Sequence, residues 1–89
     1  MIRRRFVFYG RVQGVGFRWR ARTAADAVGC TGWVRNEYDG SVTMEIQGRE
    51  EQIDRVIQAI EMSAYIRIEN MSVKTLPVDL NERRFRTEW

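Results

Sequence analysis

The segment 13–18, Gln-Gly-Val-Gly-Phe-Arg, has residue types that suit anion binding. Its two glycines allow positive φ and let the backbone approach a ligand closely. Successive N–H groups of such a loop can converge on an anion, and the N-terminus of a following helix adds its dipole. Arg18 is not favoured there for helix stability, and its planar fork suits phosphate oxygens. The pattern indicates phosphate binding, although a tight strand-to-helix turn with a solvated Arg18 also fits it, since short glycine motifs recur widely.

Asn36 is the second residue with suitable chemistry. Its side-chain amide can accept a hydrogen bond from a water and orient that water for attack on phosphorus. An asparagine ahead of an Asp39-Gly40 turn can equally stabilise the turn through its own side chain. Its position leaves both roles open.

Composition removes several classes of chemistry. The 89 residues correspond to a single domain over residues 1–89. The chain has no His and one cysteine, Cys30, which excludes imidazole acid–base work, His-ligated zinc, an internal disulfide and a thiolate cluster. Its net charge of +3 fits an anionic small molecule, a nucleic acid or simple solubility about equally. Without an apolar run of ~20 residues or a signal-peptide core, we expect a cytoplasmic protein that does not contact membranes.

Periodicity predicts the elements that position these residues. We expect strands over 4–11, 31–35, 42–47, 66–74 and 85–89, and helices over 17–28 and 49–62. Alternation over 42–47 predicts one buried and one more polar face, and a slip between Ile68 and Met71 indicates either a bulge or a late strand start. The element order, βαββαβ plus a short final strand, predicts an α+β fold. This is a ferredoxin-like two-layer sandwich with two helices on one face of a mainly antiparallel sheet.

This topology brings the two candidate segments to one edge of the sheet. The first helix is a crossover, so the strands before and after it run parallel and end at the same edge. One strand lies between them, which separates loop 13–18 from Asn36 by roughly 10 Å. A phosphate, the Arg18 guanidinium and one water could fill that gap.

Longer segments resemble the signature segments of acylphosphatases. They are Gly10-Arg11-Val12-Gln13-Gly14-Val15-Gly16-Phe17-Arg18 and Gly32-Trp33-Val34-Arg35-Asn36, followed by Asp39-Gly40-Ser41-Val42. The resemblance extends over nearly the whole chain. It implies a ferredoxin-like enzyme that hydrolyses the carboxyl–phosphate bond of small acyl phosphates. Arg18 would bind the phosphate, the amides of Gln13, Gly14, Val15, Gly16, Phe17 and Arg18 would cradle it, and Asn36 would orient the water. The chain departs from the family at 62–65, Met-Ser-Ala-Tyr, where a Gly-Pro-containing segment is common.

The implied chemistry agrees with the lack of histidine. An acyl phosphate is a mixed anhydride whose leaving group is a stable carboxylate, so little general-acid help is needed. Phosphoryl transfer depends mostly on positioning and charge stabilisation. We therefore expect a monomeric, cofactor-free enzyme that needs no metal and uses in-line attack of water without a covalent intermediate.

Two other functions compete with this hypothesis. A nucleic-acid-binding domain of the same architecture would use basic charge and sheet aromatics such as Phe6, Phe8 and Tyr9. The strand over 41–47 carries no aromatic, so we expect no nucleic-acid partner. A carbamoyl-phosphate-handling module is the second alternative, because hydrogenase-maturation carbamoyltransferases carry an acylphosphatase-like domain. Since the chain ends at Trp89, we expect a free-standing enzyme.

Three further features are expected to be structural. Arg3 to Arg5 form a solvated chain start. Cys30 is a small apolar filler. Arg35 points to the face of the sheet opposite Asn36, because successive strand residues alternate.

Overall fold

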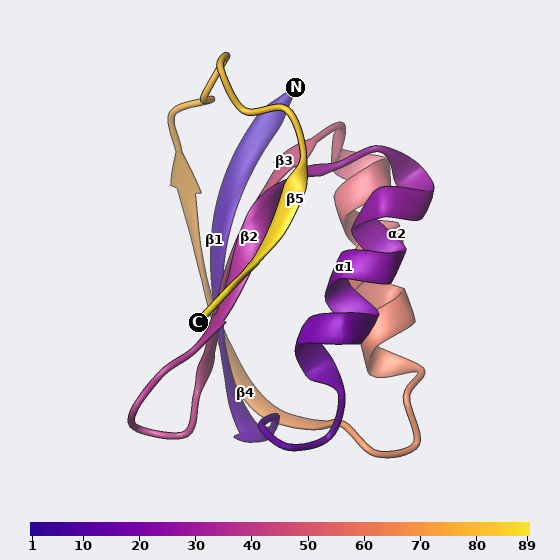
Figure 1. Cartoon of the computed structure of the whole chain (residues 1–89), viewed down its shortest axis with the longest axis vertical. Helices are drawn as coiled ribbons and strands as arrows, with labels where there is room; N and C mark the ends of the chain where they lie inside the picture. Colours follow the sequence, from indigo (N-terminus) through magenta and orange to yellow (C-terminus); the bar gives the residue numbers. More distant parts are fainter.

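The computed structural model describes residues 1–89 as a five-stranded sheet with two helices on one face (Figure 1). In chain order the elements are β1 (Ile2–Arg11), α1 (Phe17–Val28), β2 (Thr31–Asn36), β3 (Val42–Gly48), α2 (Glu50–Glu61), β4 (Arg67–Leu76) and β5 (Phe85–Glu88). The strand order is β4-β1-β3-β2-β5, and only β2 and β5 pair in parallel. The predicted ferredoxin-like α+β sandwich with an extra short strand is therefore confirmed.

The crossover through α1 has the predicted consequence. β3 lies between β1 and β2 and runs antiparallel to both, so β1 and β2 are parallel and end at the same edge. α1 begins at Phe17 and ends before Gly29, whose φ of +80° closes the helix in the left-handed conformation. The loop after β1 and the last residue of β2 are thus held at one edge by backbone hydrogen bonding.

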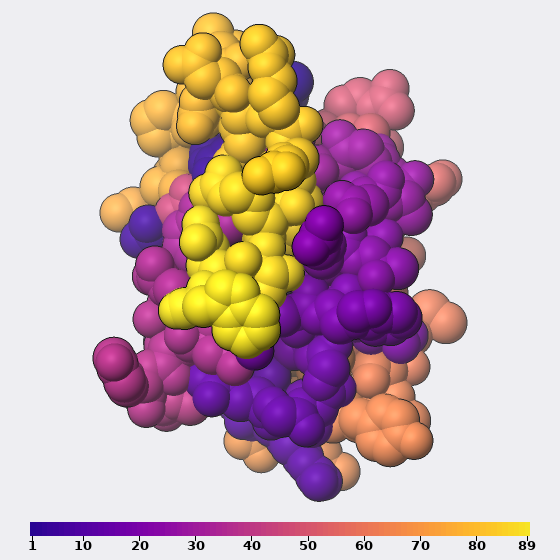
Figure 2. All heavy atoms as spheres, viewed as in Figure 1, coloured from indigo at the N-terminus to yellow at the C-terminus, as the bar shows by residue number.

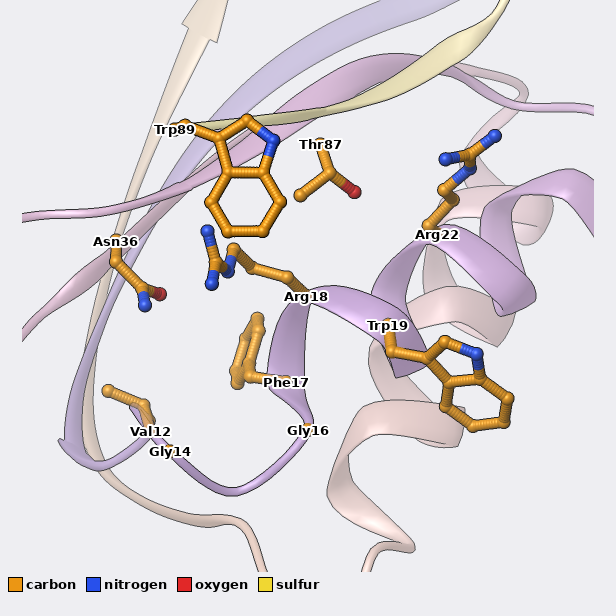
Figure 3. A pocket seen from close by; sticks show the side chains of 10 residues that line it. All are labelled: Val12, Gly14, Gly16, Phe17, Arg18, Trp19, Arg22, Asn36, Thr87 and Trp89. Carbon is orange, nitrogen blue, oxygen red and sulfur yellow. The ribbon is translucent and has the colours of Figure 1, made fainter.

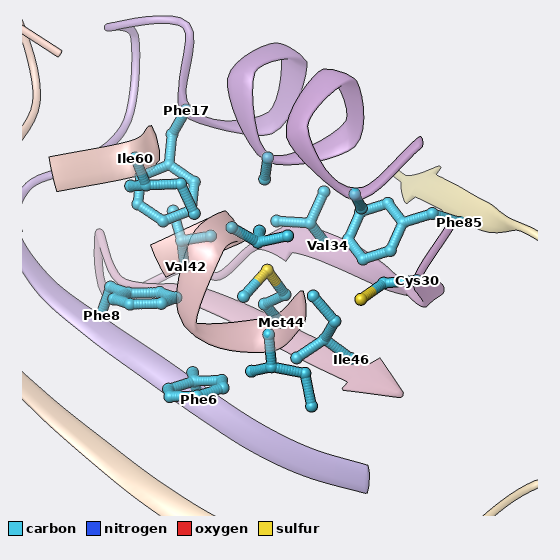
Figure 4. Close-up of a cluster of buried hydrophobic side chains, with 14 of the residues drawn as sticks. Phe6, Phe8, Phe17, Cys30, Val34, Val42, Met44, Ile46, Ile60 and Phe85 are labelled. Carbon is cyan, nitrogen blue, oxygen red and sulfur yellow. The ribbon is translucent and has the colours of Figure 1, made fainter. Parts of the chain in front are cut away.

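The hydrophobic core lies between the sheet and the two helices (Figure 4). β1 contributes Phe6 and Phe8, and the Phe8 ring packs on Phe17 of α1 with 4.9 Å between ring centroids. Burying an aromatic side chain of this size contributes about 1.5–3 kcal/mol. The start of α1 is therefore fixed to β1 by core packing.

The far face of the sheet differs from the prediction. The polar residues of β3, Thr43, Glu45 and Gln47, are also buried, at 4–8% exposure, because β3 is central and the segment after β4 folds over part of it. Gln47 and Asp79 exchange hydrogen bonds of 2.8 and 2.9 Å across this face. The alternation along β3 was predicted correctly, but the covering of its polar face by residues 77–84 was not predicted.

The predicted solvated chain start is wrong for Arg3. Arg3 is buried, at 5% exposure, and it pairs with Glu45 at 3.0 Å and Glu82 at 2.7 Å. Arg5 also pairs with Glu45. β1 lies beside β3, so Arg3 meets the buried carboxylate directly, and the pairing compensates its desolvation.

Element boundaries shift by a few residues. β1 begins at Ile2, α2 is shorter by one residue at each end, and β4 covers 67–76. Of the two alternatives for the slip in β4, the bulge is present, since the β1–β4 register shifts between Tyr9 and Gly10. A Cβ at Gly10 would lie 2.4 Å from the Arg67 carbonyl oxygen, so only glycine fits beside the bulge.

Neither helix combines the length and the apolar character needed to cross a membrane.

Candidate active site

A cleft of about 460 Å³ lies at the edge of the sheet where β1 and β2 end (Figure 3). Its volume falls in the range of small-molecule sites and exceeds what a phosphate alone would need. It is lined by Val12, Gly14, Gly16, Phe17, Arg18, Trp19, Arg22, Asn36, Thr87 and Trp89.

The loop between β1 and α1 presents unpaired backbone donors. Gly14 and Gly16 have φ of +71° and +77°, and a Cβ added at either would meet nothing within 4 Å, so their conformation, not lack of space, requires glycine. The N–H groups of residues 13–16 donate no hydrogen bond to other backbone groups. Gly16 caps α1 without a side-chain hydrogen bond, which leaves the first helical N–H groups free as well.

The two helices begin in opposite ways. α2 carries Glu50 and Glu51 in its first turn, and the Arg49 N–H donates to Gln52 Oε1 at 2.8 Å. α1 has no acidic residue in its first turn and carries Arg18 there instead. The positive end of a helix dipole favours anions. At the start of α1 the dipole and Arg18 are both positive, and no acidic side chain of the first turn balances them.

Phe17 and Val15 anchor the loop on the core. Phe17 is buried against Phe8 and also lines the cleft. Val15 is half-buried against the core and does not line the cleft. Of the predicted binding segment, Gly14, Gly16, Phe17 and Arg18 line the cleft, whereas the side chains of Gln13 and Val15 point elsewhere.

Arg18 is held by residues at the end of β5. Its guanidinium carbon lies 4.4 Å from the centre of the Trp89 ring, and its NH1 donates to the Glu88 carbonyl oxygen at 3.3 Å. No carboxylate lies within salt-bridge distance of Arg18, so its charge is not neutralised inside the protein. Figure 3 shows the guanidinium between the Trp89 ring and the Asn36 amide.

Asn36 ends β2 with its amide in the cleft. Its Oδ1 atom is buried and accepts no hydrogen bond from the protein. An unsatisfied buried acceptor costs about 1–3 kcal/mol, and such groups are rare outside functional sites. The turn after β2 uses Asp39 instead, whose Oδ1 accepts from the Ser41 N–H at 2.9 Å. The turn-stabilising alternative for Asn36 therefore has no hydrogen bond to support it.

Gln13 has a contact that the sequence analysis missed. Its side-chain Nε2 donates to the carbonyl oxygens of Glu37 at 2.7 Å and Ser41 at 2.9 Å. Glu37 directly follows Asn36, so this side chain ties the glycine loop to the hairpin that carries the asparagine. A polar residue at the start of a glycine-rich loop was the only available signal for this role.

Five cleft residues were not predicted as site residues, and the first of them, Val12, precedes the glycine loop. Trp19 and Arg22 follow Arg18 on α1, and Thr87 and Trp89 lie at the end of β5. Alternation of Phe85, Thr87 and Trp89 was visible in the sequence and places them on one face. The parallel pairing of β5 with β2, which brings that face to the cleft, could not be read from it.

The remaining candidates do not line this cleft, although Arg35 lines a smaller one beside it. Arg35 stacks over Trp33 at 4.9 Å and pairs with Glu37 at 3.0 Å. Cys30 is buried at 3% exposure, and burial raises the pKa of its thiol to about 11. The structure contains no group of three or more His, Cys, Asp or Glu side chains arranged to hold a metal ion.

Comparisons with known proteins agree on one family. The acylphosphatase family model matches residues 4–87. The acylphosphatase of Oceanobacillus iheyensis is 39% identical over 82 residues, 90% of each chain. The crystal structure of acylphosphatase from Bacillus subtilis superposes with a TM-score of 0.90 at 31% identity, covering 100% of both chains. T. kodakarensis HypF contains a similar region, with a TM-score of 0.85 at 27% identity, and the chain covers 12% of it.

Proposed function

Because this chain belongs to the acylphosphatase family, we propose that it hydrolyses acyl phosphates by attack of a water held by Asn36 on a phosphate held by Arg18 and the loop amides. The observation that carries this mechanism is one cleft with unpaired N–H groups, a guanidinium without a carboxylate partner and an unsatisfied carboxamide oxygen. Family membership supports the reaction, and these groups give each residue its proposed role.

The phosphate binds between the loop and Arg18. The N–H groups of residues 13–18 and the α1 dipole supply fixed positive ends, which need no reorganisation as the reaction proceeds. Arg18 adds a charge-assisted fork to two phosphate oxygens. Together they stabilise the charge on the equatorial oxygens in the transition state.

The water attacks from the Asn36 side. Asn36 Oδ1 accepts a hydrogen bond from this water and thereby gains the partner that it lacks within the protein. The same hydrogen bond directs a lone pair of the water toward phosphorus. A new P–O bond forms as the bond between phosphorus and the acyl oxygen breaks. The carboxylate leaves with the electron pair, and the proton of the water passes to a phosphate oxygen or to solvent. We propose that no metal is required, because Arg18 and the N–H groups supply the positive field.

The substrate is a small molecule. The cleft is formed within one chain, so we propose that a monomer is active. A single buried thiol is compatible with the reducing cytoplasm, and we propose that the enzyme acts in that compartment.

Isotope transfer tests the reaction directly. Benzoyl phosphate is hydrolysed in H₂¹⁸O, and the products are analysed by mass spectrometry. Attack on phosphorus places one ¹⁸O in inorganic phosphate, whereas attack on the carbonyl places it in benzoate. Arg18→Ala should raise KM and lower kcat, and Asn36→Ala should lower kcat alone. Label in benzoate, or activity that is lost in chelator and restored by magnesium, contradicts the mechanism.

The two alternative functions have separate tests. A nucleic-acid-binding domain would show a steep salt dependence for RNA binding and no turnover. For the carbamoyl-phosphate module, a rate on carbamoyl phosphate well above that on acetyl phosphate would be the supporting result.

A further inference from the structure

We propose that Trp89 is a positioning residue, which holds the Arg18 guanidinium toward the phosphate site through its ring face. This inference rests on the proposed role of Arg18 as the phosphate-binding residue. Trp89 lies just beyond the residues 4–87 that match the family model.

The stack uses one face of the Arg18 guanidinium. The Trp89 ring centre lies 4.4 Å from Arg18 Cζ, which is well within the range of a cation–π interaction. The Glu88 carbonyl oxygen accepts a hydrogen bond from NH1 of the same guanidinium at 3.3 Å. The guanidinium retains further N–H donors for a phosphate.

The sheet accounts for the position of Trp89. β5 pairs in parallel with β2, and the pair Arg35–Glu88 places the next residue, Trp89, beside Asn36. Trp89 lines both the main cleft and a smaller cleft next to it that includes Asn36 and Tyr38. In Figure 2 the yellow segment that ends at this residue lies against the purple atoms of α1. β5 therefore reaches from the core to the reacting groups.

An aromatic face holds an arginine without neutralising it. Arg35 is held by both Trp33 and the Glu37 carboxylate, which compensates its charge. Arg18 has an indole and a carbonyl but no carboxylate. A carboxylate at this position would immobilise Arg18 equally well, yet it would compete with the phosphate. Holding the side chain before substrate arrives lowers the entropy lost on binding.

The exposure of Trp89 argues against a role in the core. Trp89 is 93% exposed, so removing its side chain opens no buried cavity. Because the indole stays in solvent, it contributes little hydrophobic free energy to folding. Its one specific contact is with Arg18. Its substitution should therefore change the function of the cleft more than the stability of the fold.

Three substitutions separate the ring face from mere bulk. Trp89→Ala removes the side chain, Trp89→Leu keeps apolar volume without a π face, and Trp89→Phe keeps a weaker π face. We expect Ala and Leu to raise the dissociation constant of inorganic phosphate and KM on the order of three- to tenfold, and Phe to keep part of the affinity. Tyr65→Ala, a 76% exposed aromatic outside the cleft, is the control and should change neither value.

A double-mutant cycle gives the decisive readout. Phosphate binding is titrated calorimetrically for wild type, Trp89→Ala, Arg18→Ala and the double variant, so the result does not depend on turnover. If Trp89 acts through Arg18, Trp89→Ala has no further effect in the Arg18→Ala background. If Trp89→Ala weakens phosphate binding equally in both backgrounds, or if Trp89→Leu binds phosphate like wild type, this inference is overturned while the proposed role of Arg18 stands. If Arg18→Ala binds phosphate like wild type, the proposed function of Arg18 fails first, and the inference with it.

Discussion

The Gln13 side-chain amide donates a 2.7 Å hydrogen bond to the carbonyl oxygen of Glu37, the residue that follows Asn36. Its second bond, to the Ser41 carbonyl, spans the two ends of the β2–β3 turn. The loop proposed to bind phosphate and the strand end proposed to hold the water are thus joined by one side chain.

Gln13→Leu tests this connection. The backbone N–H of residue 13 is kept, so phosphate affinity should change little. The spacing between the loop and Asn36 is no longer fixed, so kcat should fall about tenfold or more, since small misplacements are costly. Steady-state kinetics with phosphate as competitive inhibitor gives both values. Gln58→Leu on the exposed side of α2 is the control, and an unchanged kcat in Gln13→Leu refutes the connection.

Asn36→Ala should separate activity from stability. The buried Oδ1 has no partner, so removing it relieves a penalty of about 1–3 kcal/mol, and the melting temperature should not fall. Loss of the group that orients the water should lower kcat about 100-fold while phosphate binding persists. A lower melting temperature with full activity would instead support the turn-stabilising role.

Gly14→Ala tests the backbone of the phosphate loop. Positive φ at a non-glycine residue costs about 1–2 kcal/mol, and relaxation of the loop would move its N–H groups apart. We expect a small loss of stability together with weaker phosphate binding. Gly40→Ala is a matched control, because Gly40 has φ of +91° and equally open space but lies in the β2–β3 turn. Equal phosphate binding in both variants contradicts the proposed role of the loop.

The fold was largely predictable because its signals are local. The helical stripe from Phe17, the left-handed terminator Gly29 and the alternation over 42–47 are properties of neighbouring residues, and each element formed within a few residues of its expected position. The right-handed crossover then placed loop 13–18 and Asn36 at one edge.

The missed features depend on contacts between distant residues. Arg3 is buried because Glu82, 79 positions away, folds back onto the sheet. Trp89 reaches Arg18 only through the parallel pairing of β5 with β2. The side-chain bonds of Gln13 likewise join segments more than twenty residues apart. Local periodicity carries no information on any of these contacts.

The ion network on the far face predicts acid sensitivity. Burial opposes ionisation of Glu45, but hydrogen bonds from Arg5 and Arg3 outweigh it and lower the pKa of this carboxyl below its ordinary 4.5. The network therefore stabilises the fold above pH 4.5, and the stability is lost as pH falls through the lowered pKa. Glu45→Gln should destabilise the protein by about 3 kcal/mol at pH 7 and flatten its loss of stability in acid. Urea unfolding at several pH values checks both expectations, and parallel curves for the two proteins would contradict them.

Cys30 should be unreactive in the folded protein. Burial raises the pKa of its thiol to about 11, so almost no thiolate exists at pH 8. A chromogenic disulfide reagent should label it only after denaturation, and alkylating conditions should leave activity unchanged. Rapid labelling of the native protein would show that the thiol is accessible.

Amide chemical shifts during a phosphate titration test the central claim most directly. In ¹H–¹⁵N spectra of the ¹⁵N-labelled protein, inorganic phosphate should shift the backbone amides of residues 13–18 and the Asn36 side-chain amide. Arg18→Ala should need far more phosphate for the same shifts. Shifts confined to other regions, or none at these residues up to high phosphate, would show that this loop is not the phosphate site.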